Sequence, residues 1–284
     1  MNKKNFTPKK IHAYLRAAIQ LVFFLFLPSA FTTAFSGIKS VLTQIGAGNP
    51  IAWSSFLTVL LALCAYTIVF GRFFCGYACA FGTLGDAVHS LYLFLCKKCK
   101  KKPLLLKKSW KKPLSYLKYA VLLAVVLLCF LGVYGDLTGW SPWDVFSMLR
   151  SGNFKVGAYW LGCILLVLIL VGMVFCERFF CRFLCPMGAV FSLLPILPFF
   201  SVRRKREKCA KGCTACEKVC PSDLSLPEDG SWNVSGDCFQ CQKCLEICPK
   251  KNAKSSIRNF RGNEIWFTLL RAVVLAAVLI LAGI

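Results

Sequence analysis

Two cysteine runs decide the fold: Cys209-Ala-Lys-Gly-Cys213-Thr-Ala-Cys216-Glu-Lys-Val-Cys220-Pro221 and Cys238-Phe-Gln-Cys241-Gln-Lys-Cys244-Leu-Glu-Ile-Cys248-Pro249. The second run has the bacterial ferredoxin spacing C-x2-C-x2-C-x3-C-P, and the first has one extra residue after its first cysteine. In this motif three cysteines of a run bind one cluster, and the fourth binds the cluster of the other run. The sequence therefore predicts two [4Fe–4S] clusters. One is held by Cys209, Cys213, Cys216 and Cys248, the other by Cys238, Cys241, Cys244 and Cys220.

Structural zinc is the alternative for these cysteines, because C-x2-C pairs also bind Zn²⁺. Zinc sites take four ligands, usually as two separated pairs, whereas these eight cysteines form two runs of four. The spacing favours clusters and predicts a two-cluster electron-transfer module.

The composition indicates a membrane protein rather than a soluble ferredoxin. Hydrophobic residues make up 57% of the 284 residues, 25 of them are phenylalanine, and the mean hydropathy is +0.62. A net charge of +23 would suggest nucleic acid as the partner of a soluble protein. Here the lysines cluster beside apolar segments, so we attribute the charge to membrane topology and expect no nucleic-acid partner.

The apolar segments predict a polytopic α-helical membrane protein with five spans and an α+β ferredoxin domain. The spans lie at about residues 11–35, 51–70, 115–134, 158–176 and 265–284, with polar connections at 36–50 and 135–157. Arg271 interrupts the fifth span, and we expect it to reach back to the membrane surface. The predicted domains are a membrane domain at 1–200, the ferredoxin domain at 201–261 and a C-terminal transmembrane helix at 262–284.

Lysine placement predicts the orientation in the cell membrane. The N-terminus, the basic loop at residues 97–112 and the flanks of the ferredoxin domain belong on the cytoplasmic side by the positive-inside rule. Neither polar connection contains a cysteine, which agrees with their facing outward, away from the reducing cytoplasm. We therefore expect a multi-pass protein of the cytoplasmic (inner) membrane, with its N-terminus and ferredoxin domain in the cytoplasm.

The membrane domain contains an internal duplication. Arg72-Phe73-Phe74-Cys75, Cys79 and Gly82 recur 106 residues later as Arg178-Phe179-Phe180-Cys181, Cys185 and Gly188. Each copy follows a pair of spans, and both pairs begin on the same side of the membrane. The sequence therefore predicts two parallel two-span repeats.

The duplication pairs two C-x3-C motifs. Positions i and i+4 share one face of a helix, so each pair can present two sulfurs together. We predict that Cys75, Cys79, Cys181 and Cys185 bind an additional metal, and thiolate ligands select iron–sulfur, zinc or Cu(I). Packing as ordinary buried cysteines is the alternative.

The C-x3-C motifs together with the ferredoxin runs resemble the polyferredoxin-type membrane proteins. This group is related to the quinol-oxidising ferredoxin subunit of periplasmic nitrate reductase systems and to the membrane regulator of nitrous-oxide reductase. Cys181-x3-Cys185-Pro186 matches the family motif C-x3-C-P, whereas Cys75-x3-Cys79 is followed by Ala80. Arg16 and Gln20 in the first span also look like the family pattern. The resemblance covers about residues 14–249 and implies a quinone as a further cofactor.

We interpret the chain as a membrane-bound iron–sulfur electron-transfer protein, an oxidoreductase component that resembles a quinol dehydrogenase. It would pass electrons between a cytoplasmic donor or the quinol pool and an acceptor in or across the membrane. Its expected partners are the quinone pool, membrane lipid and redox proteins such as an extracytoplasmic reductase or a flavoprotein. No residue pattern indicates hydrolytic or group-transfer catalysis. The alternatives are copper reduction or delivery for enzyme assembly, and redox regulation of a partner.

Overall fold

The computed structural model describes residues 8–135, 140–154, 156–197, 200–257 and 264–284. The chain is mostly helical and divides into two compact units, each built from separate stretches of sequence. The first unit comprises Met1–Leu27, Leu63–Cys79 and Phe191–Leu281, and the second comprises Pro28–Ala62, Ala80–Val190 and Ala282–Ile284. The division into residues 1–200, 201–261 and 262–284 stays a prediction.

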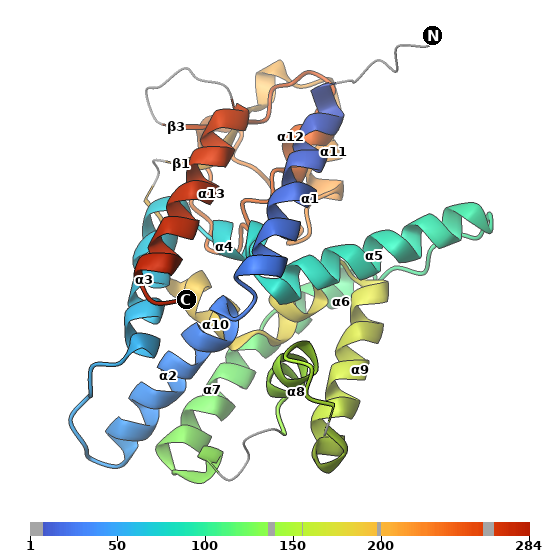
Figure 1. Cartoon of the computed structure of the whole chain (residues 1–284). Helices are drawn as coiled ribbons and strands as arrows, with labels where there is room; N and C mark the ends of the chain where they lie inside the picture. Colours follow the sequence, from blue (N-terminus) through green and yellow to red (C-terminus); the bar gives the residue numbers. More distant parts are fainter. Residues whose placement is uncertain (1–7, 136–139, 155, 198–199, 258–263) are drawn as a thin grey trace. The chain divides into compact units, whose positions relative to one another are not determined.

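The first unit packs helices around the region that carries the ferredoxin runs. Helix α1 (Pro8–Phe26) contacts α4 (Phe73–Tyr77), α12 (Lys243–Ile247) and α13 (Glu264–Leu281). The second half of α3 (Ser55–Phe70) belongs to the same unit, and α13 also contacts strand β3 (Lys254–Ile257) (Figure 1). Three segments distant in the sequence thus surround the ferredoxin region.

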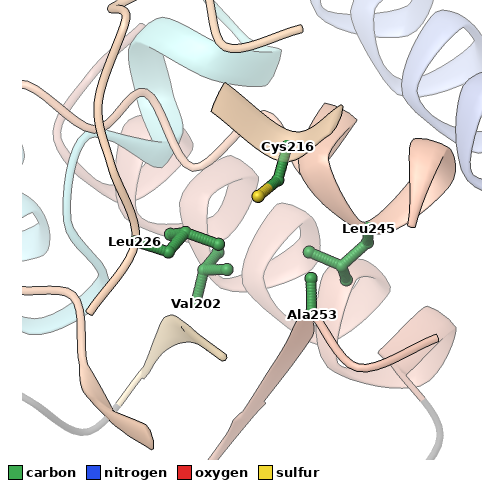
Figure 2. Packing of buried hydrophobic residues seen from close by; sticks show 5 residues of the cluster. All are labelled: Val202, Cys216, Leu226, Leu245 and Ala253. Carbon is green, nitrogen blue, oxygen red and sulfur yellow. The ribbon is translucent and has the colours of Figure 1, made fainter. Parts of the chain in front are cut away.

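The ferredoxin region is a small α+β structure. Strand β1 (Phe200–Lys205) lies between β2 (Asp229–Trp232) and β3 and pairs antiparallel with both. The short 3-10 turn η4 (Arg206–Lys208) and helix α11 (Ala215–Lys218) follow β1. Figure 2 shows its core, with the Cys216 sulfur pointing in among apolar side chains; the five members are Val202, Cys216, Leu226, Leu245 and Ala253. A predicted ligand therefore lies within the core.

The second unit is a helical bundle. Its helices are α2 (Ala30–Gly46), the first half of α3, α5 (Ala80–Lys98), α6 (Lys108–Leu114), α7 (Leu117–Phe130), α8 (Pro142–Arg150), α9 (Trp160–Phe175) and the start of α10 (Pro186–Leu193). Short turns complete it: η1 (Val133–Gly135), η2 (Val156–Tyr159) and the π-helical η3 (Phe180–Leu184). Helix α2 packs along α7, and α5 along α9.

Close packing and aromatic side chains hold this bundle together. A Cβ at Gly46 would lie 2.3 Å from the Phe130 carbonyl oxygen, so only glycine permits this approach of α2 to α7. The rings of Phe31, Phe81 and Phe180 meet in the interior, with 5.5 Å between the first two centroids and 4.6 Å between the last two. These rings bring η3, and with it Cys181, into the core.

The helices support a membrane protein, but fewer of them than predicted are long enough to span a membrane. Ser109–Phe130 and α13 are long and apolar enough to cross a membrane, and α1 with α2 would count as a third, broken span. Helices α3 and α9, predicted as spans, have 16 residues each. At 1.5 Å per residue they are about 24 Å long, shorter than the roughly 30 Å of bilayer hydrocarbon. The arrangement of five spans in two parallel repeats stays a prediction.

Two predicted boundaries are wrong. Residues 11–35 do not form one helix, because α1 ends at Phe26 and α2 begins at Ala30. Pro28 explains the break: it lacks an N–H and disfavours helix at the preceding residue. The predicted connection at 36–50 is helical as far as Gly46, since Ile38, Val41 and Ile45 recur at helical spacing. The second connection contains α8, and its residues 136–139 and 155 lie outside the described residues.

Candidate metal centre

Five cysteines line one cavity in the first unit, together with apolar side chains such as Val202 and Leu226. The cysteines are Cys216, Cys220, Cys238, Cys241 and Cys244. Four of them form the predicted set Cys220, Cys238, Cys241 and Cys244. Cys216, assigned by its spacing to the other cluster, lines the same cavity. Several thiols around an apolar hollow suit an iron–sulfur cluster, because thiolates are its ligands and exclusion of water tunes its potential.

The second run reaches this cavity through an unusual backbone. Gln240 and Gln242 flank Cys241 with φ of 53° and 61°, in the left-handed region that non-glycine residues seldom adopt. Such conformations persist only where the surroundings hold them in place. Here the Gln240 amide donates to Ser201 Oγ at 3.4 Å and the Gln242 amide donates to Thr268 Oγ1 at 2.8 Å. Strand β1 and helix α13 thus position the segment from Cys238 to Cys244, which we call the cysteine loop.

Helices α1 and α4 hold the same loop from other directions. Arg16 Nη1 donates to the Cys241 carbonyl oxygen at 2.9 Å and to Glu246 Oε1 at 2.6 Å. Gln20 Nε2 donates to the Gly76 carbonyl oxygen at 3.2 Å. A Cβ at Gly76 would lie 2.2 Å from the Phe239 carbonyl oxygen, so the absence of a side chain there permits contact between α4 and the loop. Arg16 and Gln20, expected from the resemblance, therefore act as positioning residues.

The Arg72 side chain contacts the residues on both sides of Cys238 in the sequence. Its Nη1 donates to the Gly236 carbonyl oxygen at 3.3 Å and lies 3.6 Å from Asp237 Oδ1. Its guanidinium lies over the Phe239 ring, 4.7 Å from the centroid. Burial raises the pKa of Cys238 to about 11, while the charges of Arg72 and Arg271 act to lower it. Two buried guanidinium groups thus favour negative charge on this sulfur.

The position of Arg271 differs from the prediction that it reaches back to the membrane surface. Arg271 does not reach back to a surface, because only 1% of it is exposed. Its Nη2 donates to Ser255 Oγ at 2.9 Å, its Nε donates to the Phe267 carbonyl oxygen at 3.2 Å, and its guanidinium lies 5.2 Å from the Phe73 ring centroid. Its own carbonyl oxygen accepts from the Tyr66 hydroxyl at 2.9 Å. Arg271 therefore joins α13 to β3, α3 and α4.

The other predicted set is joined by Asn252, which the sequence did not single out. Its side-chain amide donates to Cys209 Sγ at 3.3 Å, and its backbone N–H donates to Cys248 Sγ at 3.2 Å. These sulfurs come from the two ends of the motif and were assigned to one cluster. Arg204 Nη1 donates to Cys216 Sγ at 3.0 Å and lies 3.7 Å from Glu217 Oε1. Hydrogen bonds to sulfur stabilise the thiolate form that ligates iron.

The C-x3-C pairs share one local geometry, although neither pair lies within a single helix. Cys75 lies in α4 and Cys181 in η3, while Cys79 and Cys185 come just after those helices end. Cys79 N–H donates to the Phe74 carbonyl oxygen, and Cys185 N–H to the Phe180 carbonyl oxygen, both at 2.9 Å. Replacement of the motif proline by Ala80 therefore leaves this turn unchanged. The idea that each pair occupies one helix face is wrong.

All four C-x3-C cysteines are buried. Cys185 also accepts a hydrogen bond at its sulfur from the Gly188 backbone N–H at 3.2 Å, at the start of α10. Such N–H groups favour thiolate character, which a metal ligand requires. Cys75 and Cys79 belong to the first unit and Cys181 and Cys185 to the second. The four-cysteine site stays a prediction.

A family model described as a 4Fe-4S binding domain matches residues 52–113 and 158–206. These ranges contain all four C-x3-C cysteines, whereas the eight ferredoxin-type cysteines lie beyond them. NapH of Haemophilus influenzae, a ferredoxin-type protein, is 27% identical over 70% of this chain and 67% of its own length. The chain belongs to the polyferredoxin-type protein family.

The resemblance seen in the motifs is thereby confirmed. Among further relatives, protein MJ0750 of Methanocaldococcus jannaschii is 31% identical over 82% of this chain and 90% of its own length. YccM of Escherichia coli, named as a candidate electron transport protein, is 26% identical over 75% of this chain and 59% of its own length. No solved structure matches the chain significantly.

Proposed function

We propose that this polyferredoxin-type protein is a membrane-bound iron–sulfur electron carrier. It transfers electrons between a cytoplasmic donor or the quinol pool and an acceptor in or beyond the membrane. Clusters supply one-electron chemistry when bound, and the chain binds them, orients them and excludes water. The observation that carries the proposal is the cavity lined by five cysteines, held by helices α1, α4 and α13.

The contacts of the cysteine loop support transfer toward the membrane. Arg16 in α1, Gly76 in α4 and Thr268 in α13 all contact the segment from Phe239 to Gln242. Helix α13 is itself apolar and long enough to span a bilayer. A cluster on this loop would lie beside helices that reach into the membrane, where a quinone or a membrane partner could accept its electron.

We also propose that Cys75, Cys79, Cys181 and Cys185 bind a redox-active metal, with iron–sulfur as the first choice. Support comes from the family match over both motifs, from the shared turn geometry and from burial of all four sulfurs. Buried thiolates repel one another unless a cation compensates their charge, so a bound metal is consistent with these features.

The first experiment measures metal in anaerobically purified protein. The ferredoxin runs should contribute about eight iron atoms per chain, with the electron paramagnetic resonance signals of reduced [4Fe–4S] clusters. Stoichiometric zinc without iron would exclude the proposal. Copper in place of iron at the C-x3-C cysteines would favour the rival function in copper handling.

A double variant tests the second metal site. Cys75→Ser with Cys181→Ser should remove a distinct iron signal and stop electron transfer to the acceptor, while the ferredoxin signals remain. The control is Cys64→Ser with Cys163→Ser, because each is the single cysteine in the sequence of its helix, α3 or α9, with no second cysteine four residues away. If the test variant retains wild-type iron and electron transfer, the four cysteines only pack.

The cytoplasmic orientation is proposed on lysine placement. A cysteine at Gly152, an exposed turn after α8, should react with a membrane-impermeant thiol reagent applied outside the cell. A cysteine at Lys101 should react only after lysis. The opposite labelling pattern would reverse the proposed orientation.

A further inference from the structure

We propose that Arg271 is the counter-cation of the cluster bound by Cys238, Cys241, Cys244 and Cys220, and that its charge raises the reduction potential of that cluster. This inference rests on the proposed function, because it requires a cluster on these cysteines. Its evidence is a buried charge that lacks a carboxylate partner within the described part of the chain.

In the described part of the chain, the hydrogen bonds and ring contact of the Arg271 side chain are made with neutral groups. Its hydrogen bonds go to Ser255 Oγ and the Phe267 carbonyl oxygen, and its guanidinium lies near the Phe73 ring. Among the described residues, its Nη1 is buried with no hydrogen-bond partner. Arg72 and Arg204 are also buried, but each lies within 4 Å of a carboxylate, Asp237 and Glu217 respectively. Arg271 differs from them because no acid of the described residues is among its contacts.

A buried cation without a counter-charge is expensive, particularly on a helix that enters a membrane. Among the described residues, the ionisable groups close enough to interact with the charge of Arg271 include Tyr77, Tyr66 and Cys238. Tyrosine hydroxyls are neutral at physiological pH, whereas a cysteine that ligates iron is a thiolate. Cys238 is therefore the group that can compensate the charge of Arg271 once a cluster is bound.

The fold places the face of α13 that carries Arg271 next to the cysteine loop. Thr268 lies one turn before Arg271, so the two side chains share a helix face. Thr268 forms a hydrogen bond with Gln242, which lies between Cys241 and Cys244. The polar face of an otherwise apolar helix thus contacts the loop that carries three of the four ligands.

The sign of the effect follows from the cluster charge. A [4Fe–4S]²⁺ core with four thiolates carries a formal charge of −2, and one-electron reduction makes it −3. Because a nearby cation stabilises the more negative state more strongly, Arg271 favours the reduced form. Loss of its charge should make this cluster harder to reduce, and the other cluster should change less.

The test is a redox titration followed by electron paramagnetic resonance on anaerobically purified full-length protein. Arg271→Gln removes the charge but keeps hydrogen-bonding groups, and Arg271→Lys keeps the charge. Arg150→Gln, on the exposed end of α8, makes the same chemical change away from the cysteines. Arg271→Gln should shift one cluster at least tenfold toward oxidation, a fall of about 59 mV for one electron. The Lys and Arg150 variants should stay close to wild type.

Iron content separates the possible failures. If the wild-type protein contains no iron, the proposed function is wrong, and this inference is wrong with it. If Arg271→Gln retains its iron and both midpoint potentials, the inference is wrong. Loss of one cluster in Arg271→Gln but not in Arg271→Lys supports it, because binding then depends on the charge. Equal cluster loss in both variants overturns it in favour of a packing role.

Discussion

The two copies of Arg-Phe-Phe-Cys place the same residues in different surroundings. In the first copy Arg72 contacts Gly236, Asp237 and Phe239 of the ferredoxin region. In the second copy Arg178 donates from Nε to Asp86 Oδ1 at 3.0 Å and from Nη2 to Asp86 Oδ2 at 2.5 Å. Both arginines are buried, with 1% and 0% exposed. Arg72 links the ferredoxin region to the start of α4, and Arg178 links the turn between α9 and η3 to α5 in the second unit.

The repeat interval explains why the partners differ. The 106 residues between Arg72 and Arg178 also separate Asp86 from Ser192, so the second repeat lacks the acid. A Cβ at Gly236 would lie 2.2 Å from the Ser192 carbonyl oxygen, which shows how closely the ferredoxin region approaches this position. Asp237 of that region supplies the carboxylate that Ser192 does not. Both repeats thus contain the arginine, but its carboxylate partner is Asp237 in the first copy and Asp86 in the second.

A second difference lies at the position after each first cysteine. Gly76 in the first copy corresponds to Arg182 in the second. Gly76 admits the Phe239 carbonyl oxygen, whereas the Arg182 guanidinium lies over the Phe183 ring, 5.1 Å from its centroid. The first copy is thus adapted to contact the ferredoxin region.

The largest effect is expected from Asp86→Asn. The change leaves the Arg178 guanidinium buried without its carboxylate, and loss of one member of a buried pair costs about 3–5 kcal/mol. Denaturation of detergent-solubilised protein, followed by tryptophan fluorescence, should report this loss. Asp86→Asn combined with Arg178→Met should recover part of it, because the isolated charge is gone. Equal stability of wild type and Asp86→Asn would show that this pair does not stabilise the second unit.

The success of the sequence predictions depended on how local each signal was. Four of the five cysteines that line the cavity are the set that spacing assigned to one cluster, because ligands a few residues apart converge through local backbone geometry alone. The fifth, Cys216, was assigned to the other cluster, and both ligand sets stay predictions. Pro28 is also a local signal, but the apolar composition continues across it, and hydropathy alone predicts one span at this place. Arg271 and Asn252 could not be placed, since their partners Ser255 and Cys209 become neighbours only after the chain folds.

The metal site at the C-x3-C motifs stays a prediction, and the local geometry that suggested it is wrong. Spacing of four residues suggested one helix face, but the chain leaves the helix between the two cysteines in both copies. Hydrophobic patterning does not reveal this exit, because most of the residues between the cysteines are apolar or small in both copies, Arg182 being the exception. The repetition of the motif, rather than its helical geometry, was the informative signal.

An intermediate effect is expected from Gly76→Ala. The new Cβ would meet the Phe239 carbonyl oxygen at 2.2 Å, and a backbone atom cannot move aside as a flexible side chain can. Overpacking of this kind typically costs about 1–3 kcal/mol. Limited proteolysis should cleave the ferredoxin region faster in this variant. Gly157→Ala is the matched control, since no atom of the described residues lies within 4 Å of its Cβ position. Equal cleavage rates for both variants would contradict close packing at Gly76.

The smallest effect is expected from Asp237→Asn, which makes the same chemical change as Asp86→Asn. Asp237 Oδ1 lies 3.6 Å from Arg72, and its side chain is 47% exposed, so water already screens the pair. Arg72 also keeps the Gly236 carbonyl oxygen and the Phe239 ring after the substitution. We expect a loss of about 0–1 kcal/mol in the same denaturation assay. The loss should shrink further as salt is added, unlike that of Asp86→Asn, because salt screens exposed charges more than buried ones. A salt-independent loss as large as that of Asp86→Asn would mean that Asp237 is as essential to Arg72 as Asp86 is to Arg178, and the two copies would then differ only in which segment supplies the acid.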